Sequence, residues 1–314
     1  MSLLNETNVL NGLYTDIISG LEKHQKELPS KYFYDERGSE LFELICNLDE
    51  YYPTDCEIEI MNDNIAEISS LVGSNVQLIE LGSGSSIKTR LLLENLKNIA
   101  MYVPVDISSD YLKTIVAQLQ EDYPDIPIRP VAADYTEPFQ FPQTSKSEKK
   151  VIYFPGSTIG NFTKTAARMF LNNLGSKLDN HDGLLIGVDL KKDINVLEAA
   201  YNDCKGITAE FNKNILRRIN RELGSNFNIE NFEHRAHYNS TAGRIEMHLC
   251  STKNQLVQIN GRSFSFSKGE SIHTENSHKY TVKEFEELVS ESFTRVKTWT
   301  DSRSYFSVHY FEKR

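Results

Sequence analysis

The residues best suited to chemistry lie in the segment Ile79-Glu80-Leu81-Gly82-Ser83-Gly84, where a short apolar run leads into two glycines separated by one residue. Glycine adopts backbone conformations that other residues resist, and without a Cβ it lets the chain approach a ligand closely. Such a turn after a strand is typical of nucleotide binding. A plain tight connection is the alternative. The third glycine of a dinucleotide fingerprint is missing, because Ile87 and Lys88 occupy that region and a helix is predicted to begin there.

Acidic residues follow the next two predicted strands. Asp106 ends the run 101–106, about one strand-helix-strand step beyond the glycine turn, where an acid can accept hydrogen bonds from ribose hydroxyls. Asp134 and Tyr135 follow the run 128–133, where a carboxylate can accept from an adenine amino group and a ring can pack on the base. Helix capping by Asp106 and turn formation by Asp134 remain alternatives. The pattern favours S-adenosylmethionine, which has a ribose but no pyrophosphate.

A polar loop follows the fourth predicted strand. Its sequence, Phe154-Pro155-Gly156-Ser157-Thr158-Ile159-Gly160-Asn161-Phe162, combines two glycines with an amide side chain at the strand position nearest the transferred methyl in this class of sheet. A structural loop in which Asn161 is a turn residue is the alternative.

Five short apolar runs alternate with helical segments and predict a parallel α/β sheet. The helix at 111–119 repeats apolar residues at i, i+3, i+4 and i+7, Ser108 or Ser109 precedes it, and Thr163 precedes the next helix. Ligands of such sheets bind beyond the carboxyl ends of the strands. The five runs are 76–81, 101–106, 128–133, 151–155 and 184–189.

The flanking regions have a different pattern. Two helices are predicted in 33–70, the second opened by a capping box from Thr54 to Glu57. A helical stretch at 198–223 and strand-like runs in 243–272 predict an insertion, and a hairpin at 293–311 is expected to rejoin the sheet. We therefore expect a cofactor-binding domain of residues 56–192 and 279–314 and a second domain of residues 1–55 and 193–278.

Composition restricts the class of protein. The 314 residues are 39% hydrophobic and 25% charged, which is typical of a globular protein. Thirty-four basic against 44 acidic residues give a formal net charge of −10, which disfavours nucleic acid and anionic membranes as partners. We expect neither export nor a membrane span, because no basic region precedes an apolar run at the N-terminus and no apolar run of about 18 residues occurs. The scattered cysteines are typical of reduced thiols, so we expect a cytoplasmic protein. The run 144–150 contains several lysines and predicts a solvated loop.

Isolated histidines such as His248, His273 and His278 raise the question of a metal site. None lies in an H-x-x-x-H pattern or in an acid-paired spacing. The sequence therefore predicts no metal.

Several segments together resemble the histidine-specific N-alpha-methyltransferases of ergothioneine biosynthesis. The resemblance spans nearly the whole chain, and its most specific parts are Y-Y-P-T at 51–54 and G-S-T-I-G-N at 156–161; residues 32–39, 80–90, 244–249 and 274–277 also contribute. It implies a Rossmann-like class I methyltransferase sheet with an inserted α+β substrate-binding domain. The implied reaction is N-alpha-trimethylation of L-histidine to hercynine. We also expect a monomer whose partner is this small-molecule substrate.

The resemblance also implies roles for individual residues. The cofactor S-adenosyl-L-methionine would be held by Tyr34, Gly82, Lys88, Asp106, Asp134 and Tyr135, the last of which matches a phenylalanine in relatives. The substrate would lie between the two domains, with its carboxylate near Asn161 and Tyr201 and its amine near Gly156. Its imidazole would meet Tyr51, Glu275 and Ser277, with Met247 packing beside the ring.

The implied chemistry is an in-line displacement in which the α-amine attacks the sulfonium methyl. Tyr34, Gly156 and Asn161 would act at the reacting centre, and Glu275 would select the imidazole, because a carboxylate accepts from its N–H or favours its charged form. An enzyme of the same fold acting on another amine, such as a tryptophan derivative, and a non-catalytic cofactor-binding protein are the alternatives.

Overall fold

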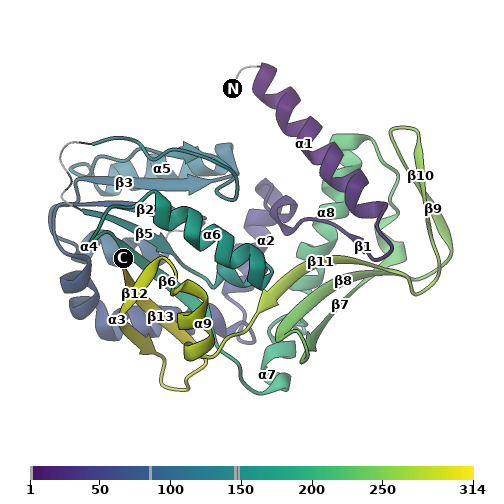
Figure 1. Ribbon diagram of the computed structural model, residues 1–314. Helices are drawn as coiled ribbons and strands as arrows, with labels where there is room; N and C mark the ends of the chain where they lie inside the picture. Colours follow the sequence, from purple (N-terminus) through teal and green to yellow (C-terminus); the bar gives the residue numbers. More distant parts are fainter. Residues whose placement is uncertain (1–2, 85–86, 145–146, 148) are drawn as a thin grey trace. The chain divides into compact units, whose positions relative to one another are not determined.

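The computed structural model describes residues 3–84, 87–144, 147 and 149–314 (Figure 1). These residues divide into two compact units. Unit 1 contains the chain up to Tyr51 together with Asp193–Ser277, and unit 2 contains Tyr52–Lys192 with His278–Arg314. Part of the predicted 144–150 loop and the first two residues of the chain lie outside the described residues. Lys149 and Lys150, which were predicted to belong to that loop, instead begin a strand.

Unit 2 is built on a seven-stranded sheet of order β12-β13-β6-β5-β2-β3-β4. Five strands are parallel, and β13 pairs antiparallel with both β6 and β12, so the predicted C-terminal hairpin does join the sheet. The strands are β2 (Val76–Leu81), β3 (Met101–Asp106), β4 (Val131–Ala132), β5 (Lys149–Phe154), β6 (Gly183–Asp189), β12 (Phe293–Thr300) and β13 (Phe306–Lys313).

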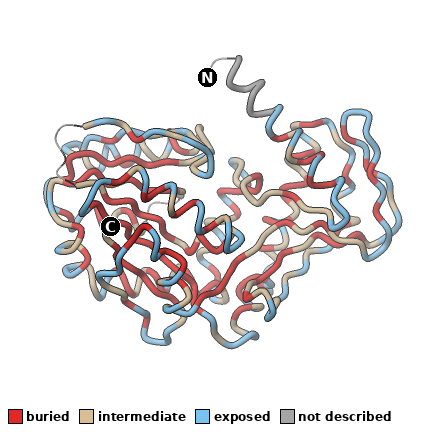
Figure 2. Tube along the Cα trace, viewed as in Figure 1, coloured by how far each residue is buried: buried red, intermediate tan, exposed pale blue. Residues whose placement is uncertain are grey.

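Helices cover both faces of this sheet, which is why β2 and β6 are buried at every position (Figure 2). Apolar residues of α6 (Lys164–Ser176) and α9 (Val282–Val289) pack with Ile186 and Val188 of β6. Gly187, which points to the opposite face, lies against α3 (Tyr52–Val72). Helix α4 (Ile87–Asn95) packs beside α3, and α5 (Ser109–Asp122) packs near β3.

Three sequence predictions are corrected by the structure, two in unit 2 and one in unit 1. The strand expected at 128–133 is reduced to the two residues of β4, because Pro130 lacks the N–H that a ladder needs. The capping box at Thr54 and Glu57 is wrong: α3 already begins at Tyr52, and the Glu57 side chain is used elsewhere. The helical stretch at 198–223 is two helices, α7 (Ile194–Ala199) and α8 (Ile207–Leu223). By contrast, Thr163 does cap α6, accepting from the N–H of Ala166.

Unit 1 contains a four-stranded sheet of order β1-β11-β8-β7 and a separate β9-β10 hairpin. Helix α8 packs on β7 and β8 through apolar residues spaced three and four apart, among them Phe211, Ile215 and Ile219. The sequence did not predict β7. The remaining elements are α1 (Leu3–Leu21), β1 (Lys26–Glu27), η1 (Ser30–Phe33), α2 (Glu36–Cys46), η3 (Ile229–Asn231), β7 (Phe232–Asn239), β8 (Arg244–Ser251), β9 (Gln255–Ile259), β10 (Arg262–Phe266) and β11 (Ser271–His278).

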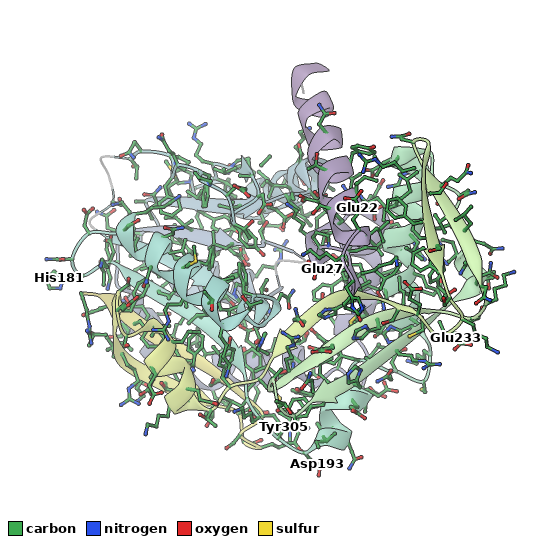
Figure 3. All side chains as sticks on the ribbon, turned by 45° about the vertical axis from the view of Figure 1, so that its right-hand side comes forward. Glu22, Glu27, His181, Asp193, Glu233 and Tyr305 are labelled. Atoms are coloured by element: carbon green, nitrogen blue, oxygen red, sulfur yellow. The ribbon has the colours of Figure 1, made fainter. Side chains whose placement is uncertain are left out.

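Among the described residues, no helix is both long and apolar enough to cross a membrane. Acidic side chains such as Glu22 and Glu233 are exposed on unit 1 (Figure 3).

Candidate functional site

The glycine turn lies at the carboxyl edge of the unit 2 sheet, directly after β2. Gly82 has φ +77°, and its N–H donates to the carbonyl of Val105 at 2.8 Å, which ties the turn to the end of β3. A Cβ added to Gly82 would lie 3.9 Å from a ring carbon of Tyr135. The backbone conformation requires glycine here, and the absent Cβ leaves room beside an aromatic ring.

Asp106 closes β3 beside this turn. Its carboxylate accepts from the N–H of Ser108 at 2.9 Å and also from backbone N–H groups of Ser83 and Gly84 in the turn. Burial raises the pKa of Asp106 above its usual value, and these backbone bonds oppose the rise. Ser108 precedes α5 but makes no side-chain cap. The carboxylate therefore joins the glycine turn to the start of α5.

Tyr135 packs edge-on against Phe154, with ring centroids 5.6 Å apart. Burial is the main cause that raises the pKa of Tyr135, and the nearby charges of Asp106 and Asp134 raise it further. The structure thus brings Gly82, Asp106, Asp134 and Tyr135 together. Asp134 also accepts from the N–H and the hydroxyl of Thr136, so it forms the turn that was the alternative to adenine binding.

Glu57 of α3 connects two predicted site residues that are distant in sequence. Its side chain is fully buried, and one oxygen lies 2.5 Å from Nζ of Lys88 at the start of α4. The N–H of Gly156 donates to both oxygens of this carboxylate, at 2.9 and 3.2 Å. A Cβ on Gly187 would lie 2.4 Å from Glu57 Oε1, so a larger residue there would displace this carboxylate. One buried acid therefore supports both Lys88 and the loop after β5.

The loop after β5 has an unusual backbone. Gly156 and Ser157 both have positive φ, +74° and +57°, and the short helix η2 (Thr158–Asn161) follows. A Cβ on Gly156 would lie 3.6 Å from Nζ of Lys88. His278 Nδ1 lies 3.0 Å from the carbonyl oxygen of Gly160, which ties the loop to the end of β11. Asn161 ends this helix with its side chain partly exposed.

Glu80, the acid before the glycine turn, is buried under the turn. Its carboxylate accepts from the hydroxyl of Thr89 at 2.7 and 2.8 Å and from that of Tyr102. Burial raises the pKa of Glu80 to about 7, even though both hydroxyls favour the charged form. Glu80 thus joins β2 to α4 and β3.

A buried ion network at the end of β6 was not predicted from the sequence. Asp189 accepts from the hydroxyl of Tyr52 at 2.8 and 2.9 Å, from Lys279 at 2.6 Å and from Lys192. Burial would raise the pKa of Asp189, but the two lysine charges outweigh it and hold the pKa below its usual value. Burial lowers the pKa of Lys192 to about 8.

In unit 1, four of the predicted substrate residues and Tyr34 form one cluster. The Tyr201 hydroxyl donates to Ser277 Oγ at 2.8 Å, and the rings of Tyr51 and Tyr201 are 6.2 Å apart. Burial raises the pKa of Tyr51, and the neighbouring Tyr201, Tyr34 and Glu275 add to the rise. The cluster combines aromatic rings, hydroxyls and one carboxylate.

Two further residues complete the comparison with the sequence predictions. Phe42, which was not predicted, lies between Tyr34 and Tyr51, with ring centroids 5.6 and 6.2 Å from theirs. Its apolar position in α2 was the only signal that could have indicated it. Met247 is buried in unit 1, and its carbonyl accepts from the hydroxyl of Thr274.

The predicted cofactor residues other than Tyr34 all belong to unit 2, as do Gly156 and Asn161. The donor set fits S-adenosylmethionine on structural grounds. Gly82, which has a positive φ, faces the ring of Tyr135. The carboxylate of Asp106 lies near the same ring, at the end of the neighbouring strand β3.

Comparisons with known proteins agree with this arrangement. Residues 13–313 match the family described as histidine-specific methyltransferase, SAM-dependent. The histidine N-alpha-methyltransferase of Mycobacterium tuberculosis is 38% identical over 94% of this chain and 93% of its own, and that of Mycolicibacterium smegmatis is 38% identical with the same coverage. Ergothioneine biosynthesis protein 1 of Neurospora crassa is 33% identical over 89% of this chain but only 32% of its own length.

The strand order and the match over nearly the whole chain confirm the Rossmann-like class I methyltransferase fold and the use of S-adenosylmethionine. The chain belongs to the family of histidine-specific, S-adenosylmethionine-dependent methyltransferases.

Proposed function

We propose that this protein methylates the α-amino nitrogen of L-histidine, in successive steps to the trimethylated betaine hercynine, as part of ergothioneine biosynthesis. The match of residues 13–313 to the family supports the reaction class, and the names of its relatives support the substrate and the pathway. The observation that carries the proposal within the structure is the cluster of Tyr51, Tyr201, Ser277 and Glu275.

This cluster suits an imidazole. A carboxylate such as Glu275 accepts from the ring N–H or favours the charged ring, while a serine hydroxyl can donate to or accept from the other nitrogen. The rings of Tyr51 and Tyr201 supply apolar walls that are already packed in place. A pocket for an indole would gain little from the carboxylate. We propose that unit 1 provides these contacts and that Met247 packs beside the imidazole ring.

We propose that the cofactor is held by Gly82, Lys88, Asp106, Asp134 and Tyr135, and that Tyr34 also contacts it. When bound, S-adenosylmethionine supplies a methyl group activated by the sulfonium charge. Asp106 would accept from the ribose hydroxyls, because its carboxylate stands beside the Gly82 turn. Tyr135 would offer a ring face to the adenine.

The amine of histidine must be neutral before it attacks. An α-amino group in a peptide has a pKa of roughly 8, so a proton must leave near neutral pH. We propose that Gly156 and Asn161 position the amine and carboxylate, since both belong to the loop that Glu57 supports. Holding the reacting atoms roughly 3 to 3.5 Å apart can supply much of the rate. Tyr34 would orient the lone pair of the partly methylated amine.

The test is incubation of the purified protein with S-adenosylmethionine and an equimolar mixture of amino acids, followed by mass spectrometry of the products. Histidine that gains three methyl groups on its α-nitrogen would establish the proposal. Methylation of another amine would keep the fold and cofactor but refute the imidazole pocket. Cofactor binding without any methylated product would support a non-catalytic protein instead.

A further inference from the structure

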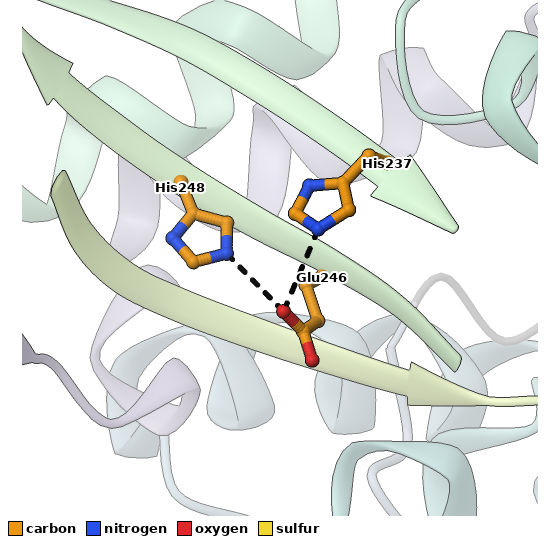
Figure 4. Close-up of side chains that lie close together, drawn as sticks. All are labelled: His237, Glu246 and His248. Carbon is orange, nitrogen blue, oxygen red and sulfur yellow. Dashed lines mark ion pairs between the residues drawn. The ribbon is translucent and has the colours of Figure 1, made fainter. Parts of the chain in front are cut away.

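Two histidines and a glutamate meet on one face of the unit 1 sheet, apart from the residues assigned above. His237 of β7 lies directly opposite Glu246 of β8 in the antiparallel register, and His248 lies two positions further along β8. Because side chains alternate along a strand, Glu246 and His248 share one face, while Ile245 and Met247 point to the other. Figure 4 shows both imidazoles directed at the same carboxylate.

Two distances within this cluster are close to those between neighbouring ligands of one ion. Glu246 Oε2 lies 3.5 Å from His248 Nε2 and 3.7 Å from His237 Nε2, which is longer than the usual N–H···O hydrogen bond. Ligand atoms bound tetrahedrally at zinc–nitrogen and zinc–oxygen distances of about 2.0 to 2.2 Å lie about 3.4 Å from each other. The three donor atoms all lie within 4.8 Å of one another.

One ring nitrogen of His248 has no hydrogen-bond partner in the part of the chain that the structure describes. Its Nε2 is shielded from solvent and makes no hydrogen bond with any described residue. Its other nitrogen, Nδ1, lies 3.3 Å from the hydroxyl of Ser271. We assign the tautomer in which Nδ1–H donates to this hydroxyl. A lone pair on Nε2 then faces a lone pair on Glu246, an arrangement that a bound cation would satisfy.

The surroundings fix the donors without occupying them. Arg244 and Asn239 bond to Glu246 Oε1, which leaves Oε2 facing the histidines. The ring of His273 stacks on that of His248 at 4.8 Å and restricts its orientation. Arg235, which lies opposite His248 in the strand register, has its own acidic neighbour: its guanidinium nitrogen is 3.6 Å from a carboxylate oxygen of Glu233.

We propose that His237, Glu246 and His248 form a binding site for a divalent transition-metal ion of the zinc class, with its fourth position open to water. Two imidazoles and one carboxylate are a donor set that zinc accepts. The His237 side chain is 54% exposed, which gives the ion a path from solvent. The ion would join β7 to β8. The sequence predicted no metal for two reasons. Glu246 and His248, two residues apart, share a face only when they lie on a strand, and the third ligand, His237, belongs to β7, which was not predicted.

The test is titration of the chelator-treated protein with Zn²⁺ by isothermal calorimetry, in a Cys204→Ser background that removes an exposed thiol. His237→Ala is the informative variant, because His237 is half exposed and its loss leaves the Glu246–Arg244 pair intact. His24→Ala, which removes an exposed histidine outside the cluster, is the matched control. Co²⁺ provides a second readout through the visible absorption of a tetrahedral site.

The expected result is one Zn²⁺ per chain, bound unchanged by His24→Ala and at least about 10- to 100-fold more weakly by His237→Ala. The Co²⁺ absorption should disappear in the same variant, and Zn²⁺ should raise the melting temperature only where the cluster is intact. Equal affinity in His237→Ala and its parent would overturn the site, as would absence of saturable binding to the parent. Neither result depends on methyl transfer.

Discussion

Glu57→Gln tests whether one buried carboxylate supports both Lys88 and the loop at Gly156. Glutamine keeps an oxygen that can accept from the Gly156 N–H but removes the charge that pairs with Lys88. Glu57 is fully buried, whereas the Lys88 side chain is 21% exposed. We therefore expect the stability loss to depend on which partner is left behind.

Removing one partner of a buried ion pair costs about 3 to 5 kcal/mol, because the remaining charge stays in the interior without compensation. Lys88→Met leaves the fully buried Glu57 charge and should reach that range. Glu57→Gln leaves Lys88, which still contacts water, so the free energy of unfolding should fall by less, about 2 kcal/mol. The double variant should be more stable than the sum of the two losses predicts, with a coupling of about 1 to 3 kcal/mol.

The assay is urea unfolding of the two single variants and the double variant, with calorimetric titration of S-adenosylhomocysteine as a second readout. Lys97→Met, which removes an exposed lysine from the same unit, should change stability by no more than about 0.5 kcal/mol. Losses that add within about 0.5 kcal/mol would show that Glu57 and Lys88 do not depend on each other. Equal losses for both single variants would refute the asymmetry argued from burial.

Three further predictions concern the proposed histidine-binding residue Glu275, Tyr34 at the reacting centre, and Glu80 beside the glycine turn. Glu275→Ala should weaken histidine binding by about 1 to 3 kcal/mol, measured by calorimetry, and unchanged affinity would remove Glu275 from the pocket. Tyr34→Phe should change the ratio of mono-, di- and trimethylated histidine more than histidine affinity, as read by mass spectrometry; equal losses at every stage would count against the proposed orientation. Glu80 has its pKa raised from 4.5 to about 7 in the folded protein, so its contribution to stability is complete below pH 4.5 and is lost as the pH rises through 7. Urea unfolding should therefore show the wild type losing up to about 3 kcal/mol relative to Glu80→Gln between pH 4.5 and 7, whereas a pH-independent difference would contradict the shift.

The elements with a strong local pattern could be predicted from the sequence. The bounds of β2 and β3 are those of the apolar runs, because strands buried on both faces are continuous apolar segments bounded by turn residues. Local signals failed where a side chain has a distant partner. Thr54 and Glu57 have the spacing of a capping box, yet Glu57 bonds to Gly156, 99 residues away.

The candidate site was predictable only in part. Glycines and acids at strand ends predicted a cofactor side, since their position follows from topology. The cluster proposed to bind the substrate could not be deduced from spacing. Tyr51, Tyr201 and Ser277 come from three separate segments that only the tertiary fold of unit 1 brings together. Those residues came from the family resemblance, whose substrate roles remain proposals.

The hydrogen-bonded ion network around Asp189 is the feature that the sequence indicated least. The chain passes between the units after Tyr51, after Lys192 and after Ser277. Tyr52, Lys192 and Lys279 are each within two residues of one of these passages, and all three bond to Asp189. Tyr52 and Lys279 are 137 and 90 residues from that carboxylate. Because a buried ion pair that loses one charge leaves its partner in the interior, Asp189→Asn should destabilise the fold at the point where Tyr52, Lys192 and Lys279 meet.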